Sequence, residues 1–283
     1  MITIDTKDIT TQLLQQYLQA AIAPRPICFA STIDKFGNVN LSPFSFFNLF
    51  SMNPPVCIFS PSRRVRDNTT KHTLENLKEV PECVINIVNY SMVQQVSLAS
   101  CEYPKEVNEF VKAGFTPMPS EIVKPPRVAE SPIQLECLVQ EIISLGEKAG
   151  AGNLVLAEIK RIHIKESVVD ENKKIDPLKL DLVARLGEDW YTRITKESLF
   201  KVEKPNTQLG IGIDQLPYCI KNNSEFSNNE KAQLANVNMM PAQEMMDYAG
   251  KISIAVVLKI KSALKNNDTQ LAWKIIETSI LHQ

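Results

Sequence analysis

The sequence is poor in the residues that build metal sites and disulfide frameworks. Its 283 residues include only three histidines, and its six cysteines form no CxxC pair. The histidines lack the spacing of a metal site, and none is linked to a plausible nucleophile, so metal and hydrolase chemistry have little support. The cysteines lie mostly inside apolar runs, where a free thiol packs as a small hydrophobe. We therefore expect no metal site and reduced cysteines.

The chain also lacks a strong net charge and a long apolar run. Its formal net charge is -1 and its pI is about 6.4, so no overall field would attract nucleic acid or an anionic membrane surface. No apolar run approaches the roughly 18 residues that span a bilayer. The first ten residues, MITIDTKDIT, lack the basic and apolar parts of a signal peptide. We expect a cytoplasmic protein whose partners are small molecules or a second copy of itself, not nucleic acid or membrane.

Glycine is scarce, with nine residues in the chain. The string Gly210-Ile211-Gly212-Ile213-Asp214 is similar to part of a dinucleotide fingerprint, but it lacks the third glycine and the strand-to-helix context. We therefore do not interpret it as a nucleotide site. Residues 24–73 are almost free of glycine, so a phosphate bound there would be held by side chains and a few extended backbone amides.

Much of the chain before residue 204 favours an antiparallel sheet. Period-two alternation predicts strands at residues 27–33, 38–42, 56–60, 83–88, 133–145 and 154–164, the last two forming a hairpin. Helical spacing is found at residues 8–23, 68–78 and 91–99. No strand is followed regularly by a crossover helix, which argues against a parallel sheet. The pattern predicts a mainly β fold with helices, namely a Greek-key or split antiparallel barrel.

Two connecting segments carry further expectations. The helix at residues 68–78 should be capped by Asn68, Thr69 or Thr70, which are the residue types that accept hydrogen bonds from a first helical turn. Residues 110–132 contain five prolines and should form extended surface chain packed along something larger.

The sequence changes character after Pro205. Ser227 and Glu230 fit a capping box, and helical patterns cover residues 228–237, 251–264 and 269–281. We predict a first domain at residues 1–204 and a C-terminal helical extension at residues 205–283.

A basic loop follows the strand at residues 56–60. Arg63 and Arg64 leave the strand together, and Lys71 and Thr73 follow at the start of the next helix. Guanidinium groups form charge-assisted bonds to phosphate, and a helix N-terminus adds amide donors. The segment therefore fits a phosphate monoester site, although a solvated basic loop has the same composition.

Small polar residues and aromatic rings gather just before this loop. Ser31, Thr32, Ser45 and Asn48 could donate to the carbonyl oxygens and ring nitrogens of a flavin. The neighbouring phenylalanines, which fit an apolar wall or a protein core equally well, are Phe44, Phe46, Phe47 and Phe50.

Several blocks of sequence resemble the flavin reductase-like FMN-binding split-barrel family, in particular its flavoredoxin-like group. The first are PRPICFASTIDKFGNVNLSPFSFFN, NPPVCIFSPSRR and KHTLENL, and the most specific is YPKEVNEFVKAGFTPMPSEIVKPPRVAESPIQLEC. CVINIV, LVLAEIKRIHI, ARLGEDWY, GIGIDQLP and LANVNMMP are also similar. The resemblance covers about residues 20 to 245.

The resemblance implies a six-stranded split barrel that forms a homodimer, with FMN bound non-covalently near the interface. Ser31 and Thr32 would lie along the isoalloxazine ring, and residues 45–48 would bond its polar edge. His163 could face the flavin or a nicotinamide, or be an ordinary wall residue. The full set of cofactor residues implied in this way is Ser31, Thr32, Ser45, Phe46, Phe47, Asn48, Ser60, Arg63, Arg64, Lys71, Thr73, His163, Arg185 and Tyr191.

At the phosphate and ribityl end the resemblance places Ser60 together with the basic loop, and Arg185 and Tyr191 nearby, in the same chain or in the partner chain. One position departs from the group. His72 stands where the group commonly has an acidic residue, so the local charge is more positive here.

The resemblance further implies an FMN-binding oxidoreductase that passes electrons from NADH or NADPH through FMN to free flavin or another small acceptor. No catalytic side chain is required, because the cofactor carries the redox chemistry. Two alternatives remain. One is a flavoredoxin-like FMN electron carrier reduced by a protein partner, and the other is a dimeric scaffold that has lost its cofactor.

Overall fold

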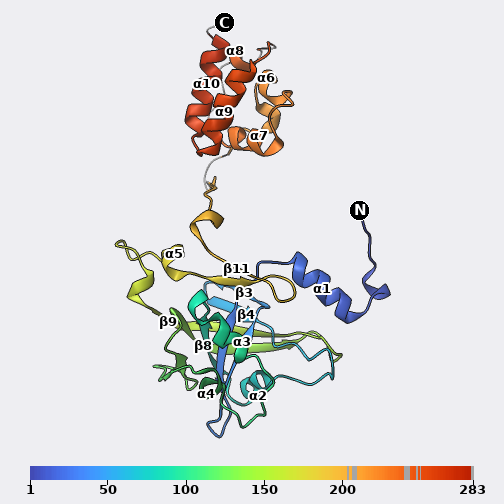
Figure 1. Cartoon of the computed structure of the whole chain (residues 1–283), viewed down its shortest axis with the longest axis vertical. Helices are drawn as coiled ribbons and strands as arrows, with labels where there is room; N and C mark the ends of the chain where they lie inside the picture. The colour runs from blue at the N-terminus through green and yellow to red at the C-terminus, as the bar shows by residue number, and fades with distance from the viewer. Residues whose placement is uncertain (203, 206–208, 239–242, 247, 249, 282–283) are drawn as a thin grey trace. The chain divides into compact units, whose positions relative to one another are not determined.

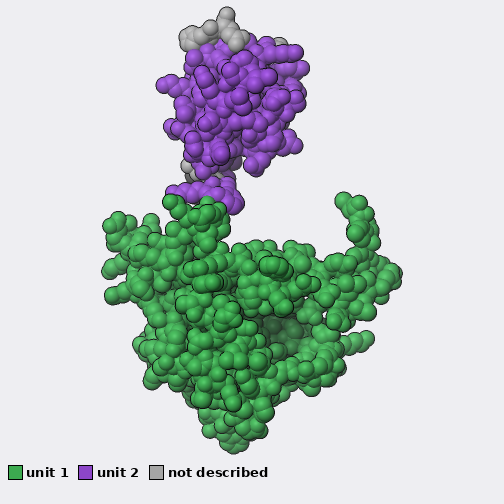
Figure 2. Space-filling view, viewed as in Figure 1, with its two compact units in different colours: residues 1–199 green, residues 200–283 purple. Residues whose placement is uncertain are grey.

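A computed structural model describes residues 1–202, 204–205, 209–238, 243–246, 248 and 250–281. The chain forms two compact units, Met1–Leu199 and Phe200–Gln283, which Figure 2 colours separately. Separate folding of two domains with a boundary at residue 204 stays a prediction. Residues 239–241 of the LANVNMMP block, together with His282, lie outside the described residues.

The first unit is built on a seven-stranded sheet with the order β2-β1-β5-β8-β9-β4-β3, in which every pair is antiparallel. Figure 1 labels β3, β4, β8 and β9 of this sheet. The strands are β1 (Cys28–Ile33), β2 (Val39–Phe44), β3 (Phe47–Met52), β4 (Pro55–Phe59), β5 (Glu82–Ile87), β8 (Ile133–Ser144) and β9 (Asn153–Ile164). Two small hairpins are made by β6 (Pro117–Met118) with β7 (Arg127–Val128), and by β10 (Val183–Arg185) with β11 (Tyr191–Arg193).

The two edges of the sheet are joined by a very short link. Strands β2 and β3 stand at opposite ends of the strand order, yet only Ser45 and Phe46 separate them in sequence. Three Cα–Cα steps reach about 11 Å at most. The sheet must therefore curl until its edges are close, and the Phe44 and Phe59 rings meet inside it at 5.5 Å between centroids. The predicted antiparallel barrel is confirmed.

The implied number of six strands is wrong, because β3 is a seventh. Its register with β4 shifts between Leu49 and Ser51, so Phe50 interrupts the pairing. Asn48, Leu49 and Phe50 are all exposed. A strand with a bulge and no buried face has no period-two signal for the sequence to show.

Short helices cover the barrel. They are α1 (Thr11–Ala21), α2 (His72–Glu79), α3 (Val93–Leu98), α4 (Glu109–Ala113) and α5 (Pro177–Leu180), with 3-10 turns at Thr6–Asp8, Tyr90–Met92, Glu166–Val168 and Lys196–Ser198. Leu77 of α2 is buried in the barrel core. A second apolar cluster joins β1 and β2 to α3 and α4, through Phe29, Leu41, Val96 and Phe110.

Residues 110–132 pack along the barrel, as predicted, but they are not surface chain throughout. They begin within α4, and Phe110, Phe115 and Val128 are buried in the second cluster. The Phe115 ring lies 5.2 Å from that of Phe29 in β1. The prediction relied on the five prolines and overlooked these three apolar residues, which pack the segment against the sheet.

The predicted cap of α2 is also wrong. The helix begins at His72, and Lys71 stands at its N-cap position with no side-chain hydrogen bond. The three predicted capping residues are used elsewhere. Asn68 Oδ1 accepts from Arg63, Thr69 Oγ1 from Arg64, and Thr70 Oγ1 donates to Glu75. The first turn of α2 is therefore left open.

The cysteine prediction is confirmed, since all six cysteines are free and five are buried. Cys28, Cys57, Cys83 and Cys137 all belong to the barrel core. Burial raises the pKa of Cys57 to about 11. A thiol that stays protonated at neutral pH behaves as a packing group.

The second unit is helical. It contains α6 (Tyr218–Lys221), α7 (Asn228–Ala235), α8 (Gln243–Met246), α9 (Ile254–Lys265) and α10 (Thr269–Leu281), with a 3-10 turn at Ile213–Gln215. The capping box between Ser227 and Glu230 is confirmed, as are the three predicted helices. Ile260, Leu234 and Ile276 are fully buried in a core of its own. None of the helices in the described part of the chain has the length and apolar character to cross a membrane.

A buried carboxylate holds the proline-rich segment to the barrel. Glu136 on β8 has no exposed surface and accepts hydrogen bonds from the backbone amides of Glu121 (2.9 Å), Ile122 (2.7 Å) and Val123 (3.3 Å). His163 Nε2 lies 2.7 Å from Glu136 Oε1. Burial opposes the charged form, but these partners outweigh it and hold the pKa of Glu136 below its ordinary value.

We expect Glu136→Gln to lower the free energy of unfolding at pH 7 by about 3 kcal/mol, because the amide donors lose a charged acceptor. The native pKa lies below the unfolded value of about 4.3, so the charge stabilises above that pH. This stabilisation is lost as pH falls through the native pKa, and the two proteins should then converge. Urea unfolding followed by circular dichroism at pH 7 and below pH 4 measures both effects.

Glu141→Gln is the matched control, since Glu141 is exposed on the same strand and should change stability by less than about 0.5 kcal/mol. Equally small losses in the free energy of unfolding for the two variants would show that Glu136 does not hold the proline-rich segment to the barrel.

Candidate functional site

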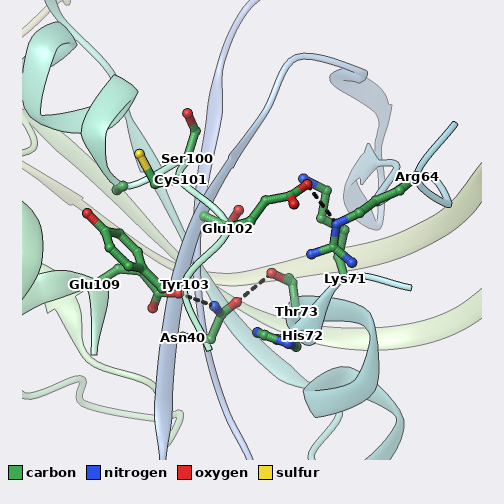
Figure 3. Close-up of a pocket in the computed structure, with 12 residues that line it drawn as sticks. Asn40, Arg64, Lys71, His72, Thr73, Ser100, Cys101, Glu102, Tyr103 and Glu109 are labelled. Atoms are coloured by element: carbon green, nitrogen blue, oxygen red, sulfur yellow. Dashed lines mark hydrogen bonds and ion pairs between the residues drawn. The ribbon is translucent and has the colours of Figure 1, made fainter. Parts of the chain in front are cut away.

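A pocket opens where the first turn of α2 faces the loop that follows α3 (Figure 3). It draws on three separate stretches of chain: strand β2, the basic loop with the start of α2, and residues 99–109. Its lining residues are Asn40, Ser42, Arg64, Lys71, His72, Thr73, Ala99, Ser100, Cys101, Glu102, Tyr103 and Glu109.

The open end of α2 gives this pocket backbone donors. Because α2 has no side-chain cap, the amides of His72 and Thr73 have no acceptor within the helix. A helix N-terminus also carries a partial positive charge, which favours a bound anion. Lys71 immediately precedes these two amides and lines the same pocket.

Two cations stand side by side in the pocket. Burial, with the Arg64 charge adding to it, lowers the pKa of Lys71. Lys71 Nζ has no hydrogen bond or ion pair with any residue that the structure describes. Arg64 is held by Thr69 Oγ1 (2.8 Å) and the Thr70 carbonyl (2.6 Å) through Nη1. An anion bound here would relieve the repulsion between the two cations and the cost of burying Lys71.

A buried network fixes the floor of the pocket. Thr73 Oγ1 donates to Asn40 Oδ1 (2.6 Å), and Asn40 Nδ2 donates to Glu109 Oε1 (2.8 Å). The backbone amide of Leu41 donates to the other Glu109 oxygen at 3.0 Å. Burial raises the pKa of Glu109 despite these bonds. The network ties the start of α2 to β2 and α4, so it sets where the open amides point.

Two residues of the predicted phosphate set shape the loop instead of lining the pocket. Arg63 Nε and Nη2 donate to Asn68, at 2.7 Å to Oδ1 and 2.6 Å to the carbonyl oxygen. Asn68 has a φ of 59°, a conformation that this clamp helps to hold. Ser60 Oγ accepts from the backbone amide of Asn153 at 3.1 Å. Phosphate contact by either residue stays a prediction.

The predicted ring residues of β1 are fully buried. Thr32 Oγ1 accepts a hydrogen bond from Asn76 of α2 at 3.2 Å. Ser31 points to the other face of the strand, and its hydroxyl has no hydrogen-bond partner in the described part of the chain. A buried hydroxyl without a partner is costly, so Ser31 is the better candidate of the two for an added polar ligand.

The link between β2 and β3 meets a buried cation. Arg25 is 7% exposed, and its guanidinium donates to the carbonyls of Gln19, Ile22 and Leu186. Its Nε also lies 3.5 Å from Ser45 Oγ. None of the acidic side chains in the described residues pairs with it. Burial, with the Arg185 charge adding to it, lowers the pKa of Arg25.

Arg185 and Tyr191 lie on the same side as this cation. The backbones of Arg25 and Arg185 exchange two hydrogen bonds of 2.9 Å. Arg185 Nη1 donates to Tyr191 Oη at 2.8 Å across the β10–β11 hairpin. These two residues therefore neighbour Ser45 through Arg25, and the structure does not bring them to the α2 pocket.

The remaining ring candidates have mixed surroundings. Phe46 is 44% exposed, Asn48 is exposed, and Phe47 packs against the barrel core. His163 bonds the buried Glu136, which gives it a structural partner. Contact of these four residues with a flavin stays a prediction. Among the described residues no cluster of three or more His, Cys, Asp or Glu side chains could hold a metal ion.

Sequence reasoning missed several residues that matter here, namely Arg25, Asn40, Glu102 and Glu109. The sequence indicates Arg25 only weakly. It lies between two prolines just before an apolar strand, where a buried guanidinium must find carbonyl oxygens as hydrogen-bond acceptors. Asn40, Glu102 and Glu109 join the pocket from distant stretches, so no local pattern could find them.

Comparison with known proteins identifies the family of the chain. The model of the flavin reductase like domain matches residues 21–179. An uncharacterised protein of Aquifex aeolicus is 34% identical over 196 residues, which cover 69% of this chain and 97% of that protein.

Two solved structures cover the first unit. Nitrilotriacetate monooxygenase component B from Bacillus cereus is 28% identical with a TM-score of 0.66, over 71% of this chain and 98% of that one. A proposed flavin reductase with a split barrel domain from Shewanella frigidimarina is 25% identical with a TM-score of 0.61, over 72% and 100%. The chain therefore belongs to the flavin reductase like domain family, and its first unit has the split-barrel fold.

Proposed function

We propose that the chain binds FMN non-covalently and acts as an NAD(P)H-dependent flavin oxidoreductase, passing electrons to free flavin or another small acceptor. The observation that carries the proposal is the pair of cations at the open start of α2. Lys71 is desolvated and unpaired, and Arg64 stands beside it. This donor set fits a phosphate monoester, which a flavin mononucleotide has and riboflavin lacks.

In this proposal the protein binds and orients the cofactor. Arg64, Lys71 and the amides of His72 and Thr73 would hold the phosphate. Strand β2 leads from Asn40 and Ser42 in the pocket to Ser45, where Arg25 supplies a buried positive charge. Such a charge would favour negative charge on the polar edge of the ring. When bound, the flavin supplies the hydride and electron chemistry itself, so no protein nucleophile is needed.

The second candidate is an FMN electron carrier that a protein partner reduces. It is favoured because the dinucleotide-like string at residues 210–214 is a poor match to a nicotinamide dinucleotide site. Gly212 has a φ of 83° and precedes a 3-10 turn, so residues 210–214 lack the strand and helix of a nucleotide fingerprint. Steady-state oxidation of NADH and NADPH separates the two candidates.

We also propose a homodimer. Helix α1 has no buried residue. Its Tyr17 and Leu18 are 49% and 48% exposed, and Ile22, which follows the helix, is 65% exposed. The edge strand β3 exposes Phe50 and Met52 at 66% and 75%. Exposed apolar side chains and an unpaired strand edge are typical of interfaces.

The double substitution Arg64→Ala with Lys71→Ala should weaken FMN binding at least about tenfold, because each charge-assisted phosphate contact contributes about 1.5–3 kcal/mol. Riboflavin binding should barely change. Arg63→Ala should cost less, since Arg63 is engaged by Asn68. Quenching of flavin fluorescence measures all of these affinities.

Lys78→Ala is the matched control, because Lys78 is exposed at the far end of the same helix. Equal losses of FMN and riboflavin affinity in the double variant would show that the pocket does not read phosphate.

The dimer should sediment at about twice the chain mass of 31.8 kDa. Phe50→Glu combined with Met52→Glu should shift it toward monomer, because buried unpaired charges oppose association. Phe36→Glu changes a phenylalanine that is 79% exposed in the β1–β2 turn and should leave the mass unchanged. A wild-type monomer, or a double variant that remains dimeric, would contradict this interface.

A further inference from the structure

Two acidic side chains line the proposed phosphate pocket: Glu109, which belongs to the network at its floor, and Glu102, which bonds Arg64. Glu102 belongs to the loop after α3, and its side chain is 42% exposed. Its Oε1 accepts from Arg64 Nε at 3.0 Å, and its Oε2 accepts from Arg66 Nη2. Figure 3 shows the carboxylate reaching across the pocket toward Arg64. The pocket thus holds an internal anion that bonds Arg64 and whose charge also acts on Lys71.

The contact occupies one of the donors of Arg64, while Arg64 Nη2 forms no hydrogen bond with any residue that the structure describes. Arg64 Nη1 is taken by Thr69 and Thr70, and Arg64 Nε is taken by Glu102. A carboxylate oxygen and a phosphate oxygen accept the same kind of charge-assisted bond. The two anions would also repel each other within one pocket. Glu102 and a ligand phosphate therefore compete for Arg64.

The charge balance around Glu102 keeps it ionised. Its hydrogen bond to Arg66 is the main cause that lowers the pKa of Glu102, opposed by partial burial and helped by Arg64. Asp67 shares Arg66 from the outer side. Lys71 faces the pocket without forming a bond to Glu102. At neutral pH the carboxylate is therefore present as an anion.

Water screens the contacts of Glu102 in part. The Glu102 side chain is 42% exposed, its partner Arg66 is 68% exposed, and its partner Arg64 is 17% exposed, so the attraction to Arg66 is screened more than the attraction to Arg64. A released Glu102 can be solvated at the mouth of the pocket. A ligand phosphate can replace it, but only by giving up part of its own binding free energy.

Resting on the proposed function, we infer that Glu102 is a built-in competitor that weakens binding of the flavin phosphate and speeds its release. It would make the phosphomonoester an exchangeable ligand instead of a permanently held group. The residue thereby acts on affinity through Arg64 and takes no part in the redox chemistry.

The test is Glu102→Gln, which keeps the shape and removes the charge. FMN should bind at least about threefold more tightly, the range that a partly exposed ion pair can supply, and its dissociation should slow. Riboflavin affinity should stay unchanged. Fluorescence quenching gives the affinities and stopped-flow displacement gives the release rate, with circular dichroism to confirm folding.

Glu106→Gln is the control, because Glu106 is exposed on the same loop and should leave both ligands unaffected. Unchanged or weaker FMN binding by Glu102→Gln would overturn the inference, and a weaker value would mean that Glu102 orients Arg64. If wild-type protein binds FMN no better than riboflavin, the phosphate pocket itself fails. If wild-type protein prefers FMN to riboflavin and Glu102→Gln does not raise the FMN affinity, only the role of Glu102 is wrong.

Discussion

The half-buried, unpaired ammonium group of Lys71 beside Arg64 is the constraint on which the site depends. Like charges held together in a partly desolvated pocket raise the free energy of the protein, and the Glu102 carboxylate offsets this only in part, since the pKa of Lys71 stays lowered. The surrounding structure is arranged to keep them there. Thr69 and Thr70 hold Arg64, and the network through Asn40, Thr73 and Glu109 fixes the start of α2. In the proposed site, stability is thus given up locally to hold an anion.

The barrel connects this pocket to a second polar centre. Strand β2 contributes Asn40 and Ser42 to the pocket and ends next to Ser45, which lies against Arg25. The two-residue link after β2 also closes the barrel, so the position of Ser45 is fixed by the fold itself. Five residue steps lead from Asn40 to Ser45, a distance of at most about 17 Å along extended chain. One strand therefore sets the spacing between the phosphate end and the ring end of the proposed cofactor site.

Local patterns in the sequence predicted the barrel, the hairpin of β8 and β9, and the helices of the second unit, because each has a regular alternation of apolar residues or a capping signal. They failed at β3, where a bulge at Phe50 and exposed side chains remove the alternation. At the site, Arg64 and Lys71 were predictable as neighbours in sequence. Asn40, Glu102 and Glu109 were not, since the fold alone brings them to α2. Arg63 looked equivalent to Arg64, yet Asn68 engages it in the loop.

The most direct test of the account is the rate of NADH and NADPH oxidation by protein loaded with FMN, compared with the same concentration of free FMN. The account predicts oxidation clearly above the free-flavin background, a rate that saturates with FMN at its binding affinity, and a loss of this saturation when riboflavin replaces FMN. Protein that binds FMN but oxidises neither nicotinamide above background would contradict the reductase assignment and leave the electron carrier.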